Sequence, residues 1–117
     1  MLEIREDQLQ ALNRDRLESA EGRALVASLV EWARDAYWEM FLGRSAAEVT
    51  AKIHGIVERA MGHGLLRFDH VRTFTALELA HGPDFDGRTP YVARTFADPR
   101  LPPGSKLALV RQRLERR

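Results

Sequence analysis

The side chains best suited to chemistry lie in residues 81–90, whose sequence is HGPDFDGRTP. Asp84 and Asp86, followed at once by a glycine, match the beginning of a calcium-binding loop, in which oxygen ligands surround a hard cation. The match then fails, because arginine, threonine and proline stand where such a loop needs further oxygen ligands. We therefore predict a structural turn, in which the aspartates accept backbone hydrogen bonds, glycine supplies positive φ and Phe85 anchors the loop. A metal loop and a partner-contact loop are the alternatives.

The histidines do not follow the spacing of a zinc site, and no cysteine is present to help them. They are His54, His63, His70 and His81. We expect His63 and His81 to lie near helix C-termini, where a protonated imidazole interacts favourably with the helix dipole. The serines do not fit the G-x-S-x-G pattern of a hydrolase, and no glycine-rich phosphate loop is present. We therefore expect no enzymatic activity, no metal and no cofactor.

Two further charged features have simple structural interpretations. Glu78 is the acid within an otherwise apolar helical run, and catalysis would need a second carboxylate in the same cleft. A solvated or arginine-paired Glu78 is the simpler expectation.

The arginines of residues 111–117 would favour phosphate contacts, but basic residues also complement the dipole at a helix C-terminus. Glu115 interrupts the basic run, so we expect no nucleic-acid partner.

Apolar side chains in the first third of the chain predict a protein-binding surface. Three leucines form a narrow stripe on a helix expected over about residues 7–20, too narrow to hold that helix by itself. Gly22 follows, either as a break or as a weak point in a continuing helix. Farther on, four aromatic residues, Trp32 and Phe41 among them, cannot share one helix face. Packing within the domain is one interpretation, and an interface is the other. The predicted partner contacts are Leu9, Leu12, Leu17, Tyr37 and Trp38.

A central helix is predicted over about residues 23–42, because its apolar residues recur at steps of three and four. A second apolar row makes this helix apolar over a broad surface, as expected of a helix packed on two sides. The residues of the main apolar face are Leu25, Leu29, Trp32, Ala33, Ala36 and Met40.

Capping signals mark the helices that follow. Gly43 suits a helix C-terminus, and Ser45 with Glu48 forms an S-x-x-E capping box for a helix over about residues 46–61. The core face of that helix is expected to contain Val49, Ile53, Ile56, Val57 and Ala60.

The second half of the chain contains three more helical segments by the same criteria. Asp69 is the expected N-cap of a helix that ends at His81, where Gly82 and a proline stop it. The Thr-Pro pair at 89–90 predicts the start of a short helix. A proline-rich connector, ADPRLPPGSK, then precedes a C-terminal helix. No segment alternates with the period of a strand, so the predicted fold is all-α, a single compact bundle of about five or six helices.

Composition predicts one domain over residues 1–117, because the length is that of a single core and 44% of the residues are hydrophobic. The formal charge of +1 provides no overall field for a nucleic acid or an anionic membrane. The absence of cysteine fits a reducing compartment. No stretch reaches the length of a membrane span, and the first ten residues lack the apolar core of a signal peptide. We therefore expect a cytoplasmic protein with no membrane partner.

Four segments of the sequence resemble a family of small helical proteins encoded beside bacterial type VI secretion effectors and their adaptor chaperones. They are MLEIREDQLQAL, ELAHGPDFD, TPYVARTF and ADPRLPPGSKLALV. The resemblance implies an accessory factor, an effector co-chaperone or adaptor, whose partner is a secreted effector or its adaptor chaperone. The alternative is an immunity protein that inhibits a cognate toxin. A second copy of the chain is another candidate occupant of the predicted surface.

Overall fold

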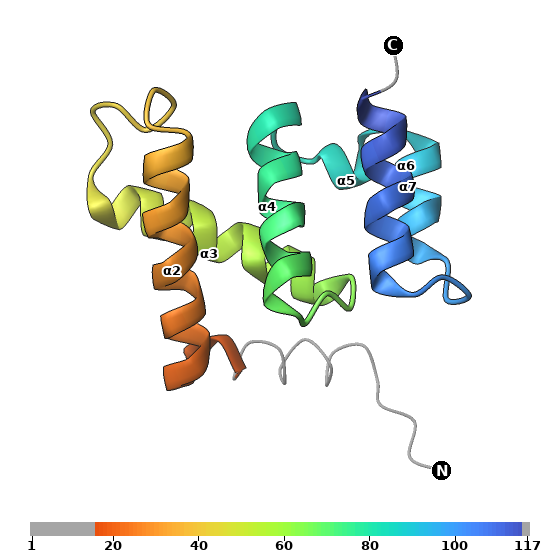
Figure 1. The fold of residues 1–117 in the computed structure, drawn as a ribbon, viewed down its shortest axis with the longest axis horizontal. Helices are drawn as coiled ribbons and strands as arrows, with labels where there is room; N and C mark the ends of the chain where they lie inside the picture. The colour runs from red at the N-terminus through yellow and green to blue at the C-terminus, as the bar shows by residue number, and fades with distance from the viewer. Residues whose placement is uncertain (1–15, 116–117) are drawn as a thin grey trace. The chain divides into compact units, whose positions relative to one another are not determined.

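The computed structural model describes residues 16–115, and their regular secondary structure is entirely helical, which confirms the all-α prediction. Figure 1 shows the six labelled helices of these residues, in line with the expected five or six. They are α2 (Ala20–Ala36), α3 (Ala46–Gly62), α4 (Phe68–His81), α5 (Phe85–Arg88), α6 (Pro90–Ala97) and α7 (Pro103–Glu115).

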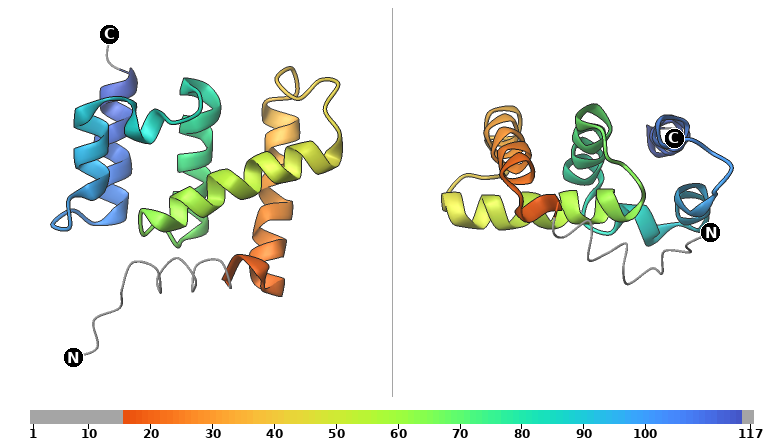
Figure 2. Two further views of the ribbon diagram at one scale, coloured as in Figure 1. Left: turned by 180° about the vertical axis from the view of Figure 1, so that it is seen from behind. Right: turned by 90° about the horizontal axis from the view of Figure 1, so that it is seen from below.

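The chain divides into two units, with the boundary between Gly62 and His63. In the first unit α2 contacts α3, and the views of Figures 1 and 2 show α3 running across α2. In the second unit α4 contacts α5 and α7, while α6 contacts the same two helices. A single domain over the whole chain stays a prediction.

The first described helix begins with a sharp change of direction at Ser19. The Ser19 hydroxyl accepts a hydrogen bond from the Gly22 N–H at 3.1 Å and so caps α2. Gly22 lies in the first turn of α2, and a Cβ there would collide with the carbonyl oxygens of Arg16 and Leu17. The break is therefore at Ser19. Because Gly22 has no side chain, its backbone can lie against the backbone of Arg16 and Leu17.

The central helix ends earlier than its apolar periodicity predicts. It stops at Ala36 rather than near residue 42, and Tyr37 is its C-cap, donating its N–H to the Ala33 carbonyl at 2.8 Å. Tighter i→i+3 hydrogen bonds follow, from Met40 to Tyr37 and from Phe41 to Trp38. The turns return Phe41 to the core, where it is 8% exposed. Burial of this phenylalanine accounts for the early end of the helix.

Helix α3 has the predicted start, one additional residue at its end and the predicted buried face. The Glu48 N–H donates to the Ser45 hydroxyl at 3.1 Å, and that hydroxyl donates to the Glu48 carboxylate at 3.3 Å. Ser45 therefore caps the helix as predicted, although the carboxylate meets its hydroxyl rather than its backbone N–H. The five predicted core residues are all buried.

Helix α4 begins two residues earlier than predicted, with Arg67 rather than Asp69 as its N-cap. Asp69 is in the first turn and pairs with the Arg67 guanidinium at 3.2 Å, so the N-cap assignment of Asp69 is wrong. A carboxylate in the first turn is still favoured by the helix dipole. At the other end, Gly82 stops the helix with φ of 97° and ψ of 166°, a conformation that only glycine adopts readily.

Helices α6 and α7 complete the second unit. The Thr89 hydroxyl accepts from the Val92 N–H at 3.4 Å, and Pro90 opens α6, as predicted. Helix α7 begins at Pro103, inside the segment predicted as a connector.

In the connector between α6 and α7, Asp98 accepts hydrogen bonds from the side chain and backbone N–H of Arg100, and these bonds lower the pKa of the Asp98 carboxyl.

Candidate protein-binding surface

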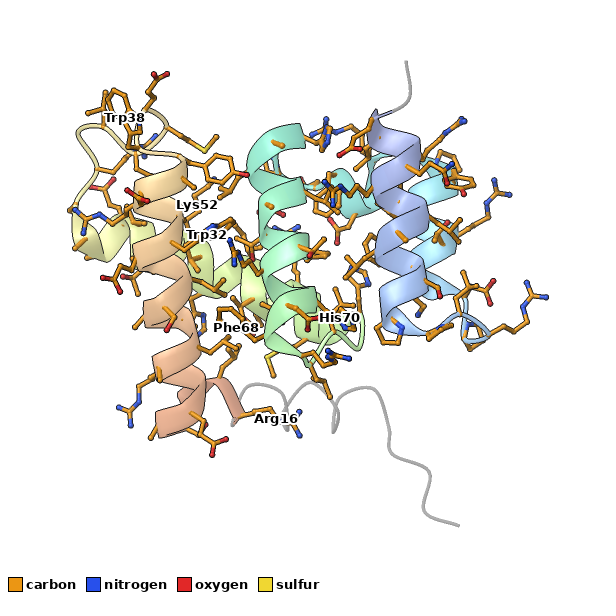
Figure 3. All side chains as sticks on the ribbon, viewed as in Figure 1. Arg16, Trp32, Trp38, Lys52, Phe68 and His70 are labelled. Atoms are coloured by element: carbon orange, nitrogen blue, oxygen red, sulfur yellow. The ribbon has the colours of Figure 1, made fainter. Side chains whose placement is uncertain are left out.

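Residues 37–43, which join α2 to α3 and are called the apolar turn below, expose an unusual density of large apolar side chains. Trp38 is 57% exposed, Met40 46% and Leu42 66%. These residues alternate along the turn, while Phe41 between them is buried. Figure 3 shows Trp38 on the loop that joins the two helices. Single exposed apolar residues are ordinary, but three within five residues of one turn are a concentration that favours a binding role.

A small pocket lies beside the apolar turn, with a volume of about 120 Å³. Its lining comes from the turn and from the start of α3 and combines apolar side chains with charged ones. The lining residues are Met40, Phe41, Arg44, Glu48, Val49 and Lys52. Arg44 and Glu48 pair at 3.5 Å. Lys52 forms no hydrogen bond or ion pair with the residues that the structure describes.

The predicted partner contacts have different positions in the structure. Trp38 is exposed, whereas Tyr37 is partly buried, with its ring edge-to-face with Trp32 at 5.7 Å. Tyr37 therefore helps to fix the base of the apolar turn. Leu17 is 1% exposed and belongs to the core of the first unit. The remaining predicted contacts, Leu9 and Leu12, lie outside the described residues.

The apolar periodicity placed Met40 on the buried helix face and gave Leu42 no predicted role. Both assignments followed from extending α2 through residue 42, since the apolar steps of three and four continue that far. Because the helix ends at Ala36, Met40 is exposed and the predicted burial of this residue is wrong.

No protein-family model, curated protein or solved structure matches this chain. None of the helices within residues 16–115 combines the length and apolar character needed to cross a bilayer.

The loop at residues 81–90 is a structural turn with a different set of contacts from those predicted. Phe85 is buried, as expected, but Asp84 caps nothing with its side chain and itself adopts a positive φ of 65°. Gly87, expected to supply positive φ, instead lies within α5. The Arg88 guanidinium donates to the carbonyls of His81 and Pro83 at 3.1 and 2.8 Å, which closes the end of α4.

Asp86 pairs with His63, whose Nε2 is 2.8 Å from the Asp86 carboxylate. The imidazole also stacks on Phe96, with ring centroids 4.5 Å apart, and approaches Phe74. His63 directly follows the last residue of α3, near a helix C-terminus as expected, and its side chain connects the loop to the aromatic core of the second unit. In hydrolase triads an aspartate orients a histidine, and that histidine takes the proton of a nucleophilic hydroxyl group. In the described part of the chain no hydroxyl group bonds to His63.

The remaining acidic and histidine side chains were considered in the sequence as possible metal ligands or acids. Within residues 16–115 no group of three or more His, Asp and Glu side chains could hold a metal ion. Glu78 is 4% exposed and has a partner, so its side chain is not solvated, and the arginine-paired alternative stays a prediction.

Proposed function

We propose that this protein is a non-enzymatic protein-binding accessory factor that contacts its partner through the apolar turn. The observation that carries the proposal is the exposure of Trp38, Met40 and Leu42 within five residues. Tryptophan is among the residues enriched at binding hot spots, and covering large apolar side chains removes area from water, which favours association. The Tyr37–Trp32 contact holds the start of the turn, and the burial of Phe41 anchors it between Met40 and Leu42.

We assign the partner class from the motif resemblance. The partner would be a bacterial type VI secretion effector or its adaptor chaperone, and the protein would act as a cytoplasmic co-chaperone or adaptor. A co-chaperone binds the part of an effector used in trafficking, whereas an immunity protein binds the toxic domain. The region of the partner that is retained therefore separates the two roles.

Copurification with the products of neighbouring genes tests this function. We expect a tagged full-length chain to retain an effector or adaptor, and Trp38→Glu to reduce the retained amount at least tenfold while circular dichroism stays native. Phe68→Glu is the matched control, because Phe68 is an aromatic residue 45% exposed in the other unit (Figure 3). Equal retention by wild type and Trp38→Glu would contradict a role for the apolar turn. Limited proteolysis of the bound partner then identifies the retained region.

A further inference from the structure

We propose that the partner presents a carboxylate beside a large apolar side chain, and that Lys52 and the pocket next to the apolar turn receive this pair. The inference rests on the proposed function, since it specifies what the apolar turn and its neighbouring pocket recognise.

The pocket has room for one apolar side chain. Its volume of about 120 Å³ is slightly below the roughly 150 Å³ of an engineered protein cavity that binds benzene. Met40, Phe41 and Val49 provide an apolar lining, and Val49 and Phe41 are themselves buried, so this part of the wall is anchored in the core. A leucine, isoleucine or phenylalanine from a partner would fit such a site better than an isolated polar group.

Within residues 16–115, the charges around the pocket leave the Lys52 ammonium group without a carboxylate partner. Glu48 already has two partners, the Arg44 guanidinium at 3.5 Å and the Ser45 hydroxyl at 3.3 Å. Lys52 follows Glu48 by one helical turn but has no partner among residues 16–115. Glu39 is the acid of the apolar turn, and it does not line the pocket. The free positive charge at the pocket therefore complements a carboxylate on the incoming segment.

An acidic and apolar segment of a protein satisfies both features at once. Lysine can lay its methylene groups along an apolar surface while its ammonium group meets a charge in water. Trp38 and Leu42 then extend the apolar contact beyond the pocket. A phosphate backbone would match Lys52 but would leave these apolar side chains uncovered, so the observations favour a peptide segment over a nucleic acid.

Selection from a phage library of random dodecapeptides on the immobilised full-length protein tests the inference. We expect enrichment of peptides with Asp or Glu next to Leu, Ile or Phe. These peptides should be lost on Lys52→Glu, retained on Lys52→Arg and lost on Leu42→Glu. Arg113→Glu, an exposed position in the other unit, is the matched control for the change in net charge and should retain them.

A charge exchange in solution makes the test specific. For the enriched peptide, Lys52→Glu should weaken binding at least tenfold, measured by fluorescence anisotropy. Replacing the acidic residue of the peptide with lysine should restore binding to Lys52→Glu but not to wild type. Circular dichroism melting curves of each variant separate lost binding from lost folding.

The outcomes distinguish this inference from the proposed function. Enriched peptides that depend on Leu42 but show no acidic preference, or that bind Lys52→Glu unchanged, overturn the inference and leave the apolar turn as a docking surface. If selection yields no peptide, or only peptides indifferent to both Leu42 and Trp38, the inference fails and the binding role of the apolar turn is contradicted as well.

Discussion

At the scale of single residues, Gly22 is a position where the close approach of neighbouring backbone leaves room only for glycine. We predict that Gly22→Ala lowers the free energy of unfolding by about 1–3 kcal/mol, because the added Cβ meets backbone carbonyl oxygens that cannot move independently. Gly55→Ala is the matched control in α3, where a Cβ meets no atom within 4 Å, and it should stabilise by about 0.4–1 kcal/mol. Urea unfolding measures both. An equal effect of the two substitutions would contradict the close approach at Gly22.

Asp86 illustrates how a loop residue can support a core. Asp86→Ala removes the contact with His63 and leaves a partly buried imidazole without that acceptor. We expect the free energy of unfolding to fall by about 1–2 kcal/mol. Asp84→Gly is the control two residues away, since Asp84 is exposed and its positive φ suits glycine, and it should be close to neutral. If chemical unfolding gives the same midpoint for Asp86→Ala and wild type, the His63–Asp86 pair does not support the fold.

At the scale of helices, the capping serine of α3 makes a local prediction. Ser45→Ala should lower the free energy of unfolding by about 1 kcal/mol, because the Glu48 N–H loses its acceptor at the start of the helix. Ser105→Ala, within the first turn of α7, is the control and should have an effect below about 0.5 kcal/mol. Thermal unfolding followed by circular dichroism distinguishes the two variants. A similar change in both would show that Ser45 contributes no capping.

The elements that sequence analysis predicted well are those whose ends depend on neighbouring residues. Ser45 and Thr89 cap α3 and α6 through bonds that span three residues, so the local sequence contains the whole signal. The end of α2 depends instead on burying Phe41, a tertiary contact, while the helical period continues past it. Periodicity alone therefore missed the apolar turn.

The candidate site was only partly predictable for the same reason. The excess of aromatic side chains identified Trp38, which the structure exposes. Leu42 is exposed in the turn that follows the early end of α2, and the pocket beside Lys52 is formed where this turn places Met40 and Phe41 beside the start of α3. Residue types indicated a surface, but the packing of the first unit determined which side chains belong to it.

At the scale of the whole molecule, the structure describes two helical units that carry different kinds of feature. The first contains the apolar turn and the pocket beside it, and the second contains the aromatic core tied by His63 and Asp86. The absence of strand-like alternation predicted an all-α protein correctly, but length and composition indicated one domain and contained no signal for the boundary after Gly62. Binding through the apolar turn is the central claim about this molecule.

The most direct test of that claim is the dissociation constant of the copurified partner for two matched variants, measured by isothermal titration calorimetry. Leu42 and Leu66 are both leucines exposed in loops, at 66% and 52%, but only Leu42 belongs to the apolar turn. We predict that Leu42→Glu weakens binding at least tenfold, equivalent to about 1.4 kcal/mol, and that Leu66→Glu leaves the constant within about twofold of wild type. Equal affinity of Leu42→Glu and wild type, with both folded, would contradict the account.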